Sequence, residues 1–175
     1  MATGYVFLFP GGFGTDNATV SQTAALSYDA SATAGSGNVP KSYALKLLFD
    51  ATTDEHWMFS IQTPGDYASG GTLRGHVKFT SATSGAAIMK GGQVSTTDGS
   101  TDDDATAYVA ADLSSSVSAP GTQGQTVEFT IALTMTNAGA EKLMRLFIGR
   151  EPDNASDTAT GDVELMDLMF EYTTT

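Results

Sequence analysis

The chain has 175 residues, of which 41% are hydrophobic and 16% charged, and its formal net charge is −12. This length fits one domain, and 8 basic residues against 20 acidic ones argue against a nucleic-acid partner, because phosphate backbones are bound by Lys and Arg. Cysteine is absent, which excludes a disulfide framework, a thiol nucleophile and a thiolate metal site.

The first forty residues are predicted to form an N-terminal strand followed by an extended arm. Residues 5–9 read YVFLF, a run that is apolar on both faces and far too short to cross a membrane. Residues 11–40 are rich in Gly, Ser, Ala, Thr and Asn, which is typical of a loop or arm crossing a surface. No signal-peptide pattern precedes the run, so we expect synthesis in the cytoplasm and no membrane partner.

Residues 41–175 are predicted to form one β-sandwich domain, because apolar side chains alternate with polar ones. The first three strands place Leu47, Phe59 and Val77 on apolar faces, with polar neighbours opposite. This period of two is typical of half-buried antiparallel strands. Gly75 falls on an apolar face, where a bulge or a close aromatic neighbour would explain it.

Further strands are expected along the rest of the chain. The segment 86–94 predicts a weaker strand broken at Gly91–Gly92, and 107–113 predicts another short one. Residues 125–136 alternate most regularly, and the segments KLMRLFIGR and VELMDLMFEY close the chain. Residues 138–147 could instead begin with a helical turn. The sequence therefore predicts an all-β fold, an antiparallel two-sheet jelly-roll sandwich of about eight strands with an N-terminal extended arm.

The sequence gives little support for a catalytic site. His56 and His76 lie on the polar faces of their strands, where solvated surface histidines are the simpler interpretation. Asp54 and Glu55 are adjacent, so on an extended chain they point to opposite faces and make a poor carboxylate pair. We expect no catalytic residues and no enzyme.

Two oxygen-rich loops and one loop aromatic are the candidate binding elements. Residues 98–104 and 152–162 could supply weak calcium ligands, although neither has EF-hand spacing and solvated loops are the simpler interpretation. We therefore predict no cofactor and no metal. Tyr67 could stack on a sugar ring, or it could plug the end of the sandwich.

The segment FDATTDEHWMFSIQTPGDYASGGTLRGHVKFT, together with the ending LMRLFIGREPDNASDTATGDVELMDLMFEY, resembles small jelly-roll virion proteins of tailed bacteriophages. The similarity covers roughly residues 41–175. It implies a non-enzymatic virion structural protein, of which a capsid decoration (cement) protein is the first expectation. Such a protein would sit on the capsid surface as a homotrimer bound to the major capsid protein.

Two other functions remain open beside decoration: a head-fibre or tail appendage module that binds host-surface glycans, and an enzyme such as a glycan hydrolase. The N-terminal strand is a candidate intersubunit or shell contact, since an extended arm can add a strand to another chain. Alternatively, this strand completes its own sandwich. The predicted contact residues are Tyr5, Val6, Phe7, Leu8 and Phe9.

Overall fold

The computed structural model describes residues 2–8, 22–30, 43–81, 83–103, 105–108 and 110–175. All regular structure in these ranges is β-strand, with no helix. The prediction of an all-β fold is confirmed, and the alternative of a helical turn within 138–147 is wrong, because Leu143–Arg150 is a strand.

Two sheets carry the fold. The six-stranded sheet runs in the order β11-β6-β13-β4-β3, and β1 also pairs with β13. Its strands are β1 (Thr3–Phe7), β3 (Ala25–Ala30), β4 (Tyr43–Phe49), β6 (Tyr67–Phe79), β11 (Thr126–Ala132) and β13 (Val163–Thr174).

The five-stranded sheet runs in the order β2-β5-β12-β8-β9. Its strands are β2 (Gln22–Thr23), β5 (Glu55–Gln62), β8 (Met89–Thr96), β9 (Asp112–Leu113) and β12 (Leu143–Arg150). A small ribbon joins β7 (Ala86–Ala87) to β10 (Val117–Ser118). The pairings are antiparallel except for the short parallel pair of β2 with β5.

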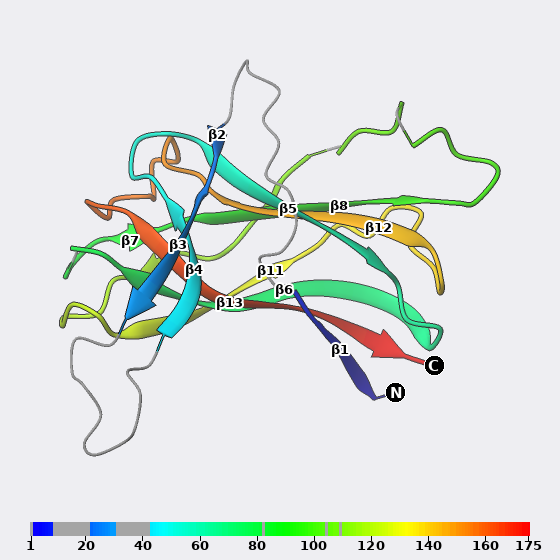
Figure 1. The fold of residues 1–175 in the computed structure, drawn as a ribbon, viewed down its shortest axis with the longest axis horizontal. Helices are drawn as coiled ribbons and strands as arrows, with labels where there is room; N and C mark the ends of the chain where they lie inside the picture. Colours follow the sequence, from blue (N-terminus) through cyan, green and yellow to red (C-terminus); the bar gives the residue numbers. More distant parts are fainter. Residues whose placement is uncertain (1, 9–21, 31–42, 82, 104, 109) are drawn as a thin grey trace.

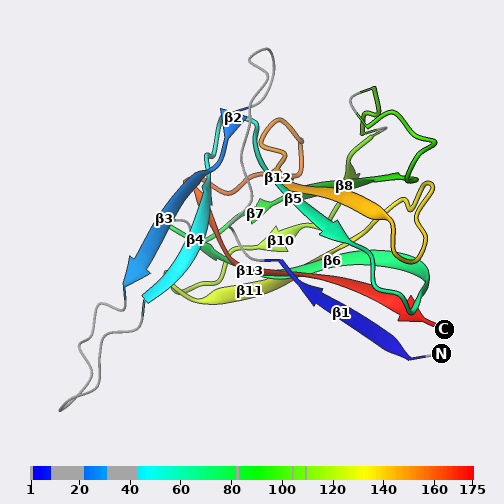
Figure 2. The same cartoon turned by 45° about the vertical axis from the view of Figure 1, so that its right-hand side comes forward.

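The two sheets face each other as the layers of a sandwich (Figures 1 and 2). The longer strands from β4 onward alternate between the layers, so that β4, β6, β11 and β13 belong to one sheet and β5, β8 and β12 to the other. Successive strands of this group therefore lie in opposite layers and pair with strands more distant in sequence, whereas β3 with β4 and β8 with β9 pair as chain neighbours. This arrangement agrees with the predicted two-sheet jelly-roll sandwich.

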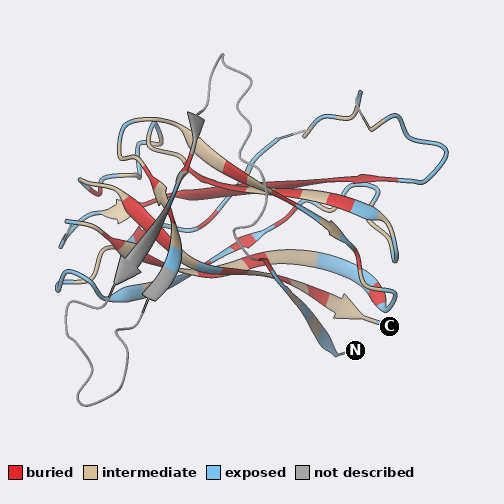
Figure 3. Cartoon of the chain, viewed as in Figure 1, coloured by how far each residue is buried: buried red, intermediate tan, exposed pale blue. Residues whose placement is uncertain are grey.

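The core lies between the layers, where the buried side chains gather (Figure 3). The predicted alternation is confirmed by Leu47, Phe59 and Val77, which are all buried. The fully buried apolar side chains come from both sheets and include Phe49, Leu73, Phe79, Ile131, Met144, Leu146, Ile148 and Phe170. Burying these rings and branched chains stabilises each by about 1.5–3 kcal/mol relative to solvent exposure.

Three local predictions differ from the structure. Within the expected arm, residues 22–30 form β2 and β3, and β3 pairs with β4 from Ala25 to Ala30; the small, polar composition conceals these strands. β8 continues through Gly91–Gly92, which pair in register with β12. The predicted strand over 107–113 is reduced to Asp112–Leu113.

A buried arginine fixes the connection between β12 and β13. The Arg150 side chain is fully buried and forms two hydrogen bonds with the Asp157 carboxylate, of 3.0 and 2.8 Å. It also donates to the carbonyl oxygens of Ala159 and Gly161. Because a buried cation must have its donors satisfied, these contacts tie the connection to the end of β12.

Candidate functional site

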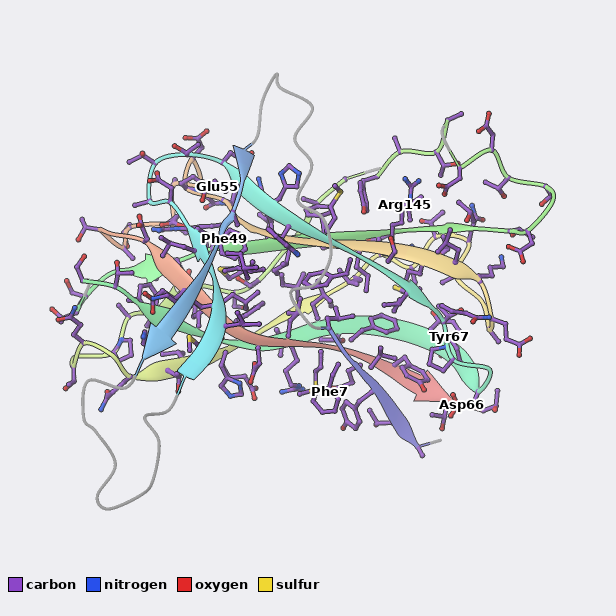
Figure 4. The ribbon with its side chains drawn as sticks, viewed as in Figure 1. Phe7, Phe49, Glu55, Asp66, Tyr67 and Arg145 are labelled. Atoms are coloured by element: carbon purple, nitrogen blue, oxygen red, sulfur yellow. The ribbon has the colours of Figure 1, made fainter. Side chains whose placement is uncertain are left out.

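Two aromatic rings stand on the outer face of the six-stranded sheet. Tyr5 is 53% exposed and Phe7 is 64% exposed, and Figures 3 and 4 show β1, with Phe7, at the surface below β13. Residues two apart on a strand share a face and lie about 6.8 Å apart along it. The two rings therefore form adjacent flat apolar surfaces on one strand.

The sequence holds β1 firmly against β13. Tyr5 pairs with Glu171 and Phe7 with Met169 in an antiparallel ladder. A backbone hydrogen bond of 2.9 Å from Leu8 to Leu168 closes one end of the strand. Gly4 lies directly against the Tyr172 ring, where any added Cβ would clash. The rings are thus carried on a positioned strand, which gives a more precise binding surface than a loop.

The structure shows the N-terminal strand completing its own sandwich, one of the two alternatives drawn from the sequence. Val6 is half-buried and Leu8 is buried against the core, so the surface side chains of this run are Tyr5 and Phe7. Phe9 lies outside the described residues. A contact of this strand with another subunit or a shell stays a prediction.

An arginine links the carboxylate beside Tyr5 to a second carboxylate two strands further across the same face. Arg74 of β6 donates from Nε to Glu171 of β13 at 3.0 Å and from Nη1 to Glu128 of β11 at 2.6 Å. The hydrogen bond to Glu171 is the main cause that raises the pKa of Arg74. All three side chains are partly exposed. Fork-like pairing of this kind fixes the guanidinium and both carboxylates in orientation.

A histidine and an aspartate extend the network. Asp167 Oδ1 accepts hydrogen bonds from the His76 backbone N–H at 2.8 Å, and it lies 3.0 Å from His76 Nδ1. The ladder between β6 and β13 is irregular here, between Leu165 and Asp167, and a Cβ on Gly75 would clash with the Asp167 carbonyl and contact Phe129. The expected bulge and the expected aromatic neighbour of Gly75 are both confirmed.

A fourth carboxylate pairs with the two lysines of the face. Glu164 pairs with Lys78 at 2.7 Å and also with Lys46, and all three side chains are largely buried. Each of the four basic side chains described on this face, Lys46, Arg74, His76 and Lys78, therefore has a carboxylate next to it.

Tyr67, the predicted glycan contact, does not present its ring to solvent. It is 6% exposed, and its ring centroid lies 5.8 Å from that of Tyr172. Burial raises its pKa. Figure 4 places it with Asp66 beside the C-terminal end of β13. The prediction of a sugar contact at Tyr67 is therefore wrong for this conformation, and the alternative, that Tyr67 plugs the end of the sandwich, describes its position.

The acidic pair Asp54 and Glu55, at the start of β5, does not act as a unit. Asp54 forms an ion pair with Lys90, whereas Glu55 accepts a hydrogen bond of 2.8 Å from the Asp50 backbone N–H. Burial is the main cause that raises the pKa of Glu55. The two carboxylates thus have separate partners, and His56 on the same strand has an interaction of its own.

The oxygen-rich loops show no metal cage in the residues that the structure describes. No group of three or more His, Asp or Glu side chains among them could hold a metal ion. In the 152–162 loop, the Asp157 carboxylate is already occupied by Arg150. Nor does any helix of sufficient length and apolar character to span a membrane occur in the described ranges.

The ion-pair network on the outer face could not be read from the sequence as a site. Alternation placed Arg74, His76 and Lys78 on the polar face of one strand and Glu128 on that of another. Which strands become neighbours, and in which register, depends on tertiary packing. The apolar pattern of Tyr5 and Phe7 was the one visible signal, and it suggested a contact surface without indicating the partner.

No protein-family model matches the chain, and no curated protein matches it significantly. Solved structures similar to it include a family 11 carbohydrate-binding module from Clostridium thermocellum in complex with a β-1,3-1,4-mixed-linked tetrasaccharide, with 11% identity, TM-score 0.45, and coverage of 97% of this chain and 96% of the module. An arabinose-bound α-L-arabinofuranosidase has 12% identity and TM-score 0.45 over 95% of this chain and 23% of the enzyme.

The enzymatically active domain of tailspike protein 4 of bacteriophage CBA120 is also similar. It shares 14% identity and a TM-score of 0.37, over 87% of this chain and 19% of that one. The chain thus spans about a fifth of both the arabinofuranosidase and the tailspike structure. At these identities and scores, the likeness concerns the β-sandwich fold and says nothing about a ligand.

Proposed function

We propose that this chain is a non-catalytic module that binds carbohydrate on the outer face of its six-stranded sheet. The observation that carries the proposal is the pair of exposed rings, Tyr5 and Phe7, on the same sheet face as the carboxylates of Glu171, which pairs with Tyr5, and Glu128, both held in place by Arg74. Ring faces attract the C–H surfaces of sugars. Carboxylates accept strong hydrogen bonds from sugar hydroxyls.

The sandwich beneath this face suits such a role because it is rigid. The face spans β1, β13, β6 and β11, which are joined by antiparallel ladders. Binding to a surface that is already ordered loses little conformational entropy. Together with the resemblance to virion proteins of tailed bacteriophages, this favours an appendage module that recognises host-surface glycans.

The rival function is the capsid decoration role, in which the chain would bind the major capsid protein as a trimer. It assigns the rings of Tyr5 and Phe7 to contact with protein. The two roles differ in what the same side chains should bind, so one pair of variants separates them.

The test is glycan-array binding by the full chain, followed by titration calorimetry on the best ligand. The double variant Tyr5→Ala/Phe7→Ala should weaken binding at least about tenfold, a loss of about 1.4 kcal/mol. Leu113→Ala/Leu143→Ala removes two exposed apolar side chains, 45% and 39% exposed, from the other sheet and should leave affinity unchanged. Equal losses in both variants, or binding to purified capsids without any glycan binding, would contradict the proposal.

A further inference from the structure

The basic side chains on the outer face of the six-stranded sheet are already paired with carboxylates of the protein itself. Arg74 lies between Glu128 and Glu171, and His76 lies beside Asp167. Lys46 and Lys78 share Glu164. The structure thus describes four basic side chains on this face and four carboxylates paired with them. The carboxylates are Glu128, Glu164, Asp167 and Glu171.

This pairing determines which sugars the face can favour. A ligand carboxylate or sulfate would approach an arginine whose two sides are occupied, and it would come close to Glu128 and Glu171. Like charges brought together at such distances are repelled, and a chain with a net charge of −12 disfavours the approach of any anion.

Neutral sugars carry no charge for these carboxylates to repel. Each hydroxyl can donate to the free lone pairs of a carboxylate, and a hydrogen bond to an ionised acceptor is about twice as strong as one between neutral groups. The Glu128 side chain is 49% exposed and that of Glu171 is 24% exposed, so both retain surface toward solvent while Arg74 holds them in place.

The same residues indicate how the ligand lies. Tyr5, Glu171, Arg74 and Glu128 belong to β1, β13, β6 and β11 in that spatial order, and Arg74 links the last three by its two ion pairs. The row is diagonal, because Glu171 pairs with Thr72 and Glu128 with His76. It covers three interstrand spacings of about 4.8 Å, about 14 Å across the strands, and four residues, about 13 Å, along them. A row of this length exceeds one sugar ring.

We propose that the ligand of this face is a neutral oligosaccharide lying across the strands from Tyr5 toward Glu128, and that the face discriminates against uronic, sialylated and sulfated glycans. The inference depends on the proposed function and narrows it to a ligand class.

The first experiment compares matched neutral and anionic glycans by titration calorimetry with the full chain. The probes are galactose oligomers against galacturonate oligomers of equal length, lactose against sialyllactose, and neutral hexasaccharides of glucose, mannose, xylose and arabinose. At least one neutral oligomer should bind at least about tenfold more tightly than its anionic partner. Its affinity should change little between low salt and about 1 M NaCl, where the screening length falls to about 3 Å.

Two outcomes overturn the inference in different ways. Tighter binding of an anionic probe that is lost in Tyr5→Ala/Phe7→Ala and weakened by salt would keep the carbohydrate function and reject the neutral class. Failure of every probe to bind would reject the carbohydrate function and the inference with it.

The second experiment changes the charge of the face. Glu128→Gln/Glu171→Gln leaves Arg74 unpaired while preserving side-chain shape, so affinity for the galacturonate oligomer should rise about tenfold and affinity for the neutral oligomer should fall. Asp98→Asn/Asp153→Asn, which alters net charge equally on two exposed loop positions, should change neither. Arg74→Gln should retain the preference for neutral sugar. An unchanged preference in Glu128→Gln/Glu171→Gln, with both variants folded by circular dichroism, contradicts the inference.

Discussion

The outer faces of the two sheets carry similar residue types, but a loop covers one face and leaves the other open. Each carries an arginine at its centre: Arg74 on the six-stranded sheet and Arg145 on the five-stranded one. Arg74 pairs with two side-chain carboxylates and stays partly exposed. Arg145, exposed to a similar degree, pairs with a single carboxylate, that of Asp103 at 3.2 Å. It also donates to the backbone carbonyls of Asp103 and Thr106, at 3.1 and 3.0 Å, and so ties a loop to the sheet (Figure 4).

The phenylalanines on the two faces show the same contrast. Phe7 is 64% exposed, whereas Phe147 packs edge-on against Tyr108 of the loop, with ring centroids 4.8 Å apart. β8 beside it is buried along its whole length. One sheet therefore uses its outer face for stability by accepting a loop as cover. The other leaves apolar rings in water, where they contribute little to stability and remain available to a ligand.

The largest expected difference between the faces is in the cost of removing these rings. Phe147→Ala should lower the free energy of unfolding by about 2–3 kcal/mol, slightly below the range for a fully buried phenylalanine, because the ring is half-buried. Phe7→Ala should change it by less than about 0.5 kcal/mol. Urea unfolding of both variants measures the difference, and equal costs would mean that Phe7 is covered in solution, as a strand contact with another subunit would require.

The sequence predicted the class of fold well but could not distinguish these two faces. Alternation correctly placed Phe59, Val77 and Leu47 in the core, because a strand buried on one face carries apolar residues at every second position of its own sequence. The polar residue types of the two outer faces look alike, with arginine, histidine and threonine in both. Whether a distant loop covers such a face depends on contacts such as Arg145 with Asp103, which lie 42 residues apart.

The same limitation explains the error at Tyr67 and the missed strands. Tyr67 sits in a Pro-Gly-Asp turn that is typical of exposed loops, yet Tyr172, far along the chain, supplies the ring that buries it. β3 consists of residues with a weak apolar pattern, and its pairing with β4 becomes visible in three dimensions alone. Local pattern thus indicated strand faces, while partners and cover required the tertiary structure.

The next prediction uses Tyr108 as a pH probe of the covered face. Burial raises the pKa of Tyr108 to about 12, against about 10 in an unfolded chain. Above pH 10 the unfolded state releases this proton and the folded state keeps it, so stability falls as pH rises from 10 to 12. Full burial would give a loss approaching 3 kcal/mol for two pKa units; partial exposure reduces it to about 2 kcal/mol.

Tyr108→Phe should remove that dependence, so the difference in unfolding free energy between wild type and Tyr108→Phe should shrink by about 2 kcal/mol across this pH range. Urea unfolding at a series of pH values measures it, with ultraviolet titration of tyrosinate as a direct check. A Tyr108 that ionises near pH 10 would show that the loop does not cover the five-stranded sheet in solution.

The smallest expected difference is between the unfolding free energies lost on replacing the two arginines. It measures how much the contacts of Arg145 with the loop stabilise the fold. Arg145→Met removes an ion pair with Asp103 and two hydrogen bonds to carbonyl groups of the loop. It should cost about 1–2 kcal/mol, with faster proteolysis near Asp103. Arg74→Met breaks partly exposed ion pairs and should cost no more than about 0.5 kcal/mol. Because the substitution is the same, the difference reflects the surroundings: backbone acceptors beneath a loop lose their partner, whereas solvated carboxylates regain water. Equal costs would contradict the division into a covered and an open face.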